Sequence, residues 1–172
     1  MPVIRGEAIA RVITTEQRRG VVDQLSKELS GEITPDGPVI FEIPFETSEK
    51  FDVLVVWDAW EPFGSEDRSN IILEVYKERK EMIAQALGVT HGEAIEQQVL
   101  PYAVIPMVRR EEVDSEKLKR VMIIEGGFAL KNGKVDLRFP TMSLAEEAHR
   151  RLSDEMPTGY WSIVQTAASI PY

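Results

Sequence analysis

The chain has 172 residues, of which 43% are hydrophobic, and it carries a formal net charge of −9 at pH 7. This length suits one domain or two small halves, and the apolar content is enough for a core without covalent cross-links. Because the sequence contains no cysteine, it excludes disulfides, thiolate zinc sites and cysteine nucleophiles.

Charge and hydropathy also restrict the partners and the location. A net acidic surface repels phosphate backbones, so we expect no nucleic acid partner. The sequence has no run of about 18 apolar residues, so we expect no membrane span. Its first residues, MPVIRGEAIARVITT, lack the long apolar core of a signal peptide, and we therefore expect a cytoplasmic protein.

The first predicted elements are a short strand and a helix. Residues 3–13 are rich in valine and isoleucine, which favours a strand. Thr14 or Thr15 can then cap a helix that Gly31 ends. The apolar residues of this helix recur at helical spacing and are Val21, Val22, Leu25 and Leu29.

An antiparallel hairpin is predicted next, over residues 39–57. Alternate residues from Val39 to Phe45 are apolar, which is typical of a strand with one buried face. Pro44 favours an edge position, because proline cannot donate a ladder hydrogen bond. The second strand, FDVLVVW, is apolar on both faces, so we expect it to be central and covered on both sides.

A helix of about six turns is predicted after the bend EPFGS. Ser65 can cap it, and Glu66 and Asp67 place negative charge in its first turn. We expect Gly88 to end this helix. Its buried stripe comprises Ile71, Ile72, Val75, Tyr76, Met82, Ile83 and Ala86.

A short helix and a strand complete the N-terminal half. Thr90 and Glu93 have the spacing of a capping box, which predicts a helix to about Gln98. A strand follows over about 102–108, and its prolines, Pro101 and Pro106, again indicate a sheet edge. The charged segment 109–114 marks the expected seam between the two halves.

The C-terminal half begins with a short helix at SEKLKRV and continues with a hairpin. Asn132-Gly133 lies between two apolar runs, which predicts a two-residue type I′ turn. This turn would pair Leu130 with Val135, Phe128 with Leu137 and Gly126 with Phe139, so that the apolar residues share one face. Ser143 and Glu146 form a further capping-box pattern ahead of a helix, and residues 160–168 read as a last strand.

The predicted fold class is α+β, with an antiparallel sheet built from hairpins and helices on at least one face. We predict an N-terminal αββααβ half (residues 1–110) and a C-terminal αββαβ half (residues 111–172) that pack as one compact unit. The element order of the N-terminal half is similar to that of small KH-like and BolA-like domains. The glycine-bracketed GXXG loop of KH domains is missing, and we assign no family.

The segment WDAWEPFGSED carries the densest group of candidate functional side chains. The ligand-binding candidates in this segment and directly after it are Trp57, Asp58, Trp60, Glu61, Asp67 and Arg68. We expect Trp57 to be largely buried and Trp60 to lie nearer the surface, because Trp60 comes just before the turn at Glu61-Pro62. A carboxylate against aromatic groups can have its pKa raised and act as an acid or base, which is one interpretation of Asp58. The alternative is that Asp58 caps a backbone turn and that Arg68 forms an ion pair with Asp58 or Glu61.

No other part of the sequence has the spacing of a known reactive site. His91 and His149 are the only histidines, and their positions form neither a triad nor a zinc set. We therefore expect no metal and no cofactor. The leading hypothesis is a non-enzymatic binding or assembly module that can associate with itself or with a protein partner. The alternative is a small carboxylate-dependent enzyme, of the hydrolase or isomerase type, that uses residues 58–67.

Overall fold

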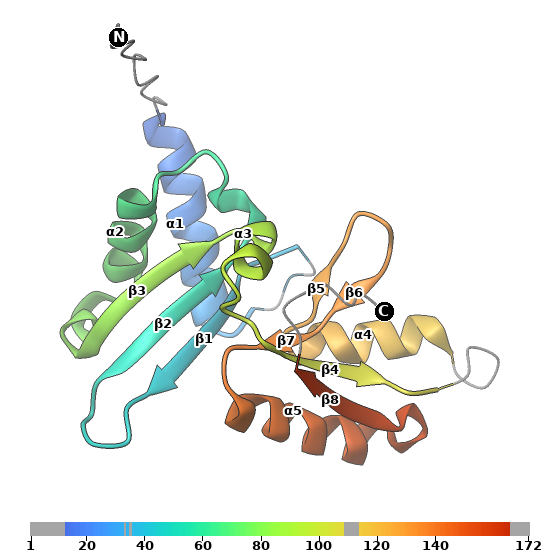
Figure 1. Cartoon of the computed structure of the whole chain (residues 1–172). Helices are drawn as coiled ribbons and strands as arrows, with labels where there is room; N and C mark the ends of the chain where they lie inside the picture. Colours follow the sequence, from blue (N-terminus) through green and yellow to red (C-terminus); the bar gives the residue numbers. More distant parts are fainter. Residues whose placement is uncertain (1–12, 33, 35, 109–113, 166–172) are drawn as a thin grey trace, which may run out of the picture.

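The computed structural model describes residues 13–32, 34, 36–108 and 114–165, and this part of the chain is α+β, as predicted (Figure 1). Its α-helices are α1 Thr15–Leu29, α2 Ser65–Tyr76, α3 His91–Glu96, α4 Ser115–Ile124 and α5 Met142–Glu155. The strands are β1 Val39–Pro44, β2 Phe51–Val56, β3 Ile83–Val89, β4 Tyr102–Pro106, β5 Phe128–Ala129, β6 Val135–Asp136, β7 Arg138–Phe139 and β8 Trp161–Gln165. Short 3-10 turns are η1 Asp58–Trp60, η2 Lys77–Met82 and η3 Pro157–Gly159.

Helix α1 forms where the sequence predicts it. The Thr14 hydroxyl accepts a hydrogen bond from the Gln17 backbone N–H at 3.1 Å, and the Gln17 side chain accepts one from the Thr14 N–H at 3.0 Å. This capping box satisfies two of the N–H groups that every helix start leaves open. Gly31 follows the helix with a φ of 101°, a conformation that glycine adopts without strain. The strand predicted over residues 3–13 lies outside the described residues, except for Ile13.

The hairpin of β1 and β2 is also confirmed. The strands pair antiparallel from Val39 opposite Val56 to Pro44 opposite Phe51. In the described sheet β1 is an edge strand, as Pro44 predicts, and β2 lies between β1 and β3. Four consecutive residues of β2, from Val53 to Val56, are at most 5% exposed, so the strand is covered on both faces.

The long helix predicted to end at Gly88 is wrong, because α2 stops at Tyr76. Lys77 has a φ of 54°, which breaks the helix, and the charged turn η2 follows. Residues 83–89 form β3, which pairs parallel with β2. The apolar residues after Lys77 fit either helical spacing or a short strand. They form a strand because the backbone groups along one edge of β2 need partners, which β3 supplies. Helix α2 supplies the crossover that a parallel pair requires.

Two apolar cores cover the opposite faces of the β1–β2–β3 sheet. On one face, Val53 and Val55 pack with residues of α1 and α2. On the other, Leu54 and Val56 pack with residues of the C-terminal half, among them Leu118 of α4. The alternation along one strand therefore joins both cores, since neighbouring side chains of a strand point to opposite faces.

A second sheet, of order β7–β4–β8, supports the C-terminal half (Figure 1). The edge position predicted for β4 is wrong, because β4 pairs antiparallel with β7 on one side and with β8 on the other. Its prolines do not prevent this, since Pro101 precedes the strand and Pro106 is its last residue. Helix α5 packs against all three strands. The predicted division at residue 110 is not tested by these contacts and remains a prediction.

The hairpin of β5 and β6 forms around Asn132-Gly133, but the predicted type I′ turn is wrong. Gly133 has a φ of 79°, whereas Asn132 does not have a positive φ. The Leu130 N–H donates to the Lys134 carbonyl at 2.9 Å, so the loop has three residues and ends in a glycine bulge. The register therefore differs by one residue from the predicted one, and Phe128 lies opposite Asp136.

The start of α5 also differs from the prediction. Its N-cap is Thr141, whose hydroxyl accepts from the Leu144 N–H at 3.3 Å, rather than Ser143. Both residues have an acceptor oxygen, but Thr141 is the one with extended backbone. Within the described residues, no helix has the length and apolarity that crossing a membrane requires.

Candidate functional site

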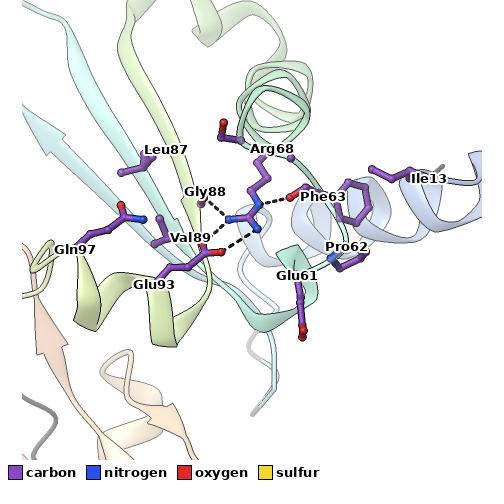
Figure 2. Close-up of a pocket in the computed structure, with 12 residues that line it drawn as sticks. Ile13, Glu61, Pro62, Phe63, Arg68, Leu87, Gly88, Val89, Glu93 and Gln97 are labelled. Carbon is purple, nitrogen blue, oxygen red and sulfur yellow. Dashed lines mark hydrogen bonds and ion pairs between the residues drawn. The ribbon is translucent and has the colours of Figure 1, made fainter. Parts of the chain in front are cut away.

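A cavity of about 650 Å³ lies where the loop after η1 meets β3 and α3 (Figure 2). Residues 61–65 and Ile13 form one wall, and residues 87–89 of β3 form another. Glu93 of α3 and Gln97 close the site on the α3 side, and the Arg68 side chain lies between these walls. We call this cavity the Arg68 pocket.

The Arg68 residue is only 7% exposed, and its side chain is fixed by four hydrogen bonds. Its Nε donates to the Phe63 carbonyl at 2.8 Å, and one terminal nitrogen donates to the Gly88 carbonyl at 3.2 Å. Both terminal nitrogens donate to the Glu93 carboxylate, at 2.5 and 3.2 Å. The bidentate partner is thus Glu93 rather than Asp58 or Glu61, the two acids predicted from the sequence.

The carboxylate of Glu93 belongs to the pocket and to the start of α3 at once. Its Oε2 accepts from the Thr90 N–H at 3.0 Å, and the Thr90 hydroxyl accepts from the Glu93 N–H at 3.2 Å. This is the capping box that the sequence predicts. The hydrogen bond from Arg68 lowers the pKa of Glu93, and the bond from Thr90 acts in the same direction against partial burial.

Helix α2 brings Arg68 and its neighbour Ser69 to the outer edge of β3. Arg68 binds the Gly88 carbonyl, and the Ser69 hydroxyl donates to the Ala86 carbonyl at 2.8 Å. These side chains satisfy carbonyl groups that an edge strand leaves unpaired. A Cβ atom on Gly88 would lie 2.9 Å from the Arg68 Cβ and 3.0 Å from the Trp60 ring, so this approach requires glycine.

The aromatic members of the predicted site are core residues. Trp57 is 3% exposed, and Trp60 is fully buried. The expectation that Trp60 lies nearer the surface is wrong, because the 3-10 turn η1 brings its ring against Trp57 and Phe63. The Trp60 indole N–H donates to the Val55 carbonyl at 3.2 Å. Trp60 therefore does not line the pocket, and its ring packs against Gly88, which does.

The acidic members of the predicted site lie in different places. Glu61 is exposed and lines the Arg68 pocket, where its carboxylate points away from Arg68 (Figure 2). Asp67 is exposed in the first turn of α2. Asp58 is also exposed, and its Oδ1 accepts from the His91 backbone N–H at 3.1 Å. Asp58 thus ties the loop to the first turn of α3, close to the capping role that the sequence offers as the alternative.

A second polar cluster, which the sequence pattern does not predict, lies on the other side of α3. The His91 Nε2 lies 2.7 Å from the Asp136 Oδ2, and the Arg138 Nε donates to the Asp136 Oδ1 at 3.0 Å. The His91 ring also stacks on Phe128, with ring centroids 4.5 Å apart and planes 16° apart. Asp136 and Arg138 are 2% and 3% exposed. We call these four residues the His91 cluster.

The alternation of apolar and charged residues in KVDLRF, residues 134–139, hid this cluster. It predicts that Asp136 and Arg138 face solvent, on the side opposite Val135 and Leu137. Both faces of this segment are in fact buried, because the N-terminal half covers the charged side. The only available sequence signal was a pair of opposite charges at strand spacing.

The remaining histidine, His149 of α5, contacts the backbone of β8. Its Nε2 lies 2.9 Å from the Trp161 carbonyl of β8. Among the described residues, no group of three or more histidine, aspartate or glutamate side chains is arranged to hold a metal ion. A search for related proteins finds no matching family model, curated protein or solved structure.

Proposed function

We propose that this chain is a non-enzymatic binding module that holds a small polar molecule in the Arg68 pocket. The observation that carries the proposal is a cavity of about 650 Å³ beside a buried guanidinium that is already fixed by four hydrogen bonds. Cavities of roughly 300–1,000 Å³ are typical of small-molecule sites. A preorganised polar group lowers the entropy that binding costs.

The lining favours a neutral or positively charged ligand. Two acidic residues, Glu61 and Glu93, line the cavity together with one guanidinium, and the Glu93 carboxylate already accepts from both terminal nitrogens of Arg68. The whole chain is acidic, with a formal charge of −9. Anions are therefore disfavoured, which applies equally to small phosphates and to nucleic acid. Phe63 and Leu87 add an apolar surface to the same cavity.

A larger groove, of about 1,020 Å³, runs along residues 70–83, but it is a weaker candidate. The side chains that line it are mostly exposed and come from one continuous segment, α2 to the start of β3. None of its charged residues is buried. A ligand there would gain little from desolvation, whereas the Arg68 pocket joins three separate parts of the chain.

The enzymatic alternative has less support from the same residues. A general acid must be protonated near the working pH, and the hydrogen bond from Arg68 keeps the pKa of Glu93 low. Asp58 is exposed and holds the start of α3.

Thermal unfolding in the presence of two compound panels tests the proposal. The first panel holds small amines and amides, and the second holds carboxylates and phosphates of matched size. A true ligand at about 100 times its Kd should raise the melting temperature by about 5–10 °C. We expect such hits only from the first panel. If neither panel stabilises the protein, or only anions do, the proposal is wrong.

A matched pair of variants locates the binding site. Gln97→Trp places an indole at the mouth of the Arg68 pocket and should abolish the stabilisation. Glu96→Trp changes an exposed neighbour that does not line the pocket and should leave it unchanged. A ligand that stabilises both variants equally binds elsewhere, and the pocket assignment then fails.

A further inference from the structure

Helix α3 is held by side chains from three separate parts of the chain. Asp58 accepts from the first N–H of the helix, and Arg68 binds Glu93 through two hydrogen bonds. Asp136, from the C-terminal half, binds the ring of His91 at 2.7 Å. The helix has only six residues, so it has little stability of its own and depends on these contacts.

On the pocket side, one oxygen atom has two roles. Glu93 Oε2 accepts from Arg68 and from the Thr90 N–H that opens α3. A ligand that hydrogen-bonds to Arg68 or Glu93 therefore shares the atoms that fix the first turn of the helix, and we expect it to shift those hydrogen bonds. His91 lies in this same turn, directly after Thr90.

On the opposite side, the His91 ring contacts the C-terminal half, so a movement of that turn would displace the ring against it. Its ring contacts Phe128 and Asp136, which lie opposite each other on β5 and β6. The Asp136 side chain is 1% exposed, so the loss of a hydrogen-bond partner cannot be replaced cheaply by water. The hairpin is thus sensitive to the position of a single ring from α3.

We infer that α3 couples occupancy of the Arg68 pocket to the hairpin of β5 and β6 in the C-terminal half. The inference rests on the proposed function for its signal, a bound molecule, but the coupling itself belongs to the folded chain. Glu93 is the positioning residue on the pocket side, and His91 is its counterpart on the hairpin side. Binding in one half would then alter the surface of the other.

A double-mutant cycle measures this coupling without any ligand. Glu93→Gln weakens the pocket side of α3, and Asp136→Asn weakens the hairpin side; no hydrogen bond joins these two residues. We expect the urea midpoint of the double variant to fall by less than the sum of the two single shifts, because a loosened α3 makes less use of Asp136. Additive shifts would overturn the coupling.

The control cycle combines Glu93→Gln with Glu125→Gln. Glu125 accepts from the Arg151 Nε at 2.7 Å within the C-terminal half and makes no hydrogen bond to α3. These shifts should be additive. Non-additivity of the same size in the control cycle would mean that Glu93 affects stability globally, and the inference would fail.

Amide spectra of the single variant give an independent measurement that does not require Asp136→Asn to fold. Glu93→Gln should shift the backbone resonances of Phe128 and Asp136, which it does not contact. Shifts confined to residues near α2, β3 and α3 would contradict the coupling. Either failure leaves the pocket assignment standing, whereas failure of both compound panels to bind removes the proposed function and leaves the coupling intact.

Discussion

Gly88 lines the Arg68 pocket, lies at the edge of β3 and contacts Trp60 of the apolar core that includes α1 and α2. Any side chain there would have to displace the Cβ of Arg68 at 2.9 Å and the Trp60 ring at 3.0 Å. We predict that Gly88→Ala lowers the free energy of unfolding by about 1–3 kcal/mol through overpacking. Gly92→Ala is the matched control, because a Cβ there meets nothing within 4 Å. Urea unfolding of both variants checks the prediction, and equal stability would contradict it.

Trp60 and Ile72 are both fully buried in the apolar core that includes α1 and α2. Trp60→Ala removes the larger side chain and also leaves the Val55 carbonyl without its indole donor. We expect a loss of about 3–5 kcal/mol for Trp60→Ala and of about 2–5 kcal/mol for Ile72→Ala. The urea midpoint of Trp60→Ala should therefore be no higher than that of Ile72→Ala. A clearly higher midpoint would mean that Trp60 is not a core residue.

Because of Glu93, we expect the free energy of unfolding to change with pH in the acid range. Its pKa is lowered in the folded state, chiefly by the hydrogen bond from Arg68. A lowered folded pKa contributes stability above the unfolded value of about 4.3, and this contribution is lost as the pH falls through the folded pKa. The stability difference between wild type and Glu93→Gln should therefore be larger at pH 7 than at pH 3.

Chemical denaturation at the two pH values checks this difference, with Glu96→Gln as the control. Glu96 is an exposed residue at the end of the same helix, so its replacement should have little effect at either pH. A Glu93→Gln difference that is the same at both pH values would show that the ion pair with Arg68 does not contribute.

At the scale of elements, the N-cap residue of α5 differs between the structure and the sequence prediction. Thr141 caps the helix through the Leu144 N–H, while the pattern favours Ser143. We predict that Thr141→Ala costs about 0.5–2 kcal/mol and that Ser143→Ala costs much less. Thermal unfolding of the two variants decides between these caps, and the reverse order would support the capping box at Ser143.

Local signals predicted most elements but not their partners. An N-cap threonine with apolar spacing predicted α1, a capping box predicted α3, and apolar alternation predicted the β1–β2 hairpin. Each of these elements is specified by residues that are neighbours in the sequence. Residues 83–89 were misassigned because a short apolar run becomes a strand only when another strand lies beside it. The one-residue error at Gly133 had a similar cause, since a glycine bulge and a type I′ turn share the Asn-Gly signal.

The candidate site was predicted in part for the same reason. The segment 57–68 does contribute Glu61 and Arg68 to the pocket, and it is the right part of the chain. The residues that complete the pocket, Gly88 and Glu93, follow a crossover that the sequence did not reveal. The contact of His91 with Asp136 joins positions 45 residues apart, and no spacing rule connects them.

At the scale of the whole molecule, α3 lies between two ion pairs whose arginines are buried. Arg68 and Glu93 belong to the pocket in the N-terminal half, and Asp136 and Arg138 belong to the C-terminal half. Buried ion pairs add little net stability, but breaking one by removing a partner is costly. We therefore expect these ion pairs to fix the position of α3 between the halves more than they raise the overall stability.

Amide shift mapping is the sharpest test of whether the Arg68 pocket binds a small polar molecule. A stabilising amine or amide should be titrated into the uniformly labelled wild-type chain. We expect saturable shifts concentrated at residues 61–65, 87–89 and 93–97, which surround the pocket. Saturable shifts concentrated on another surface, with these residues unmoved, would contradict it.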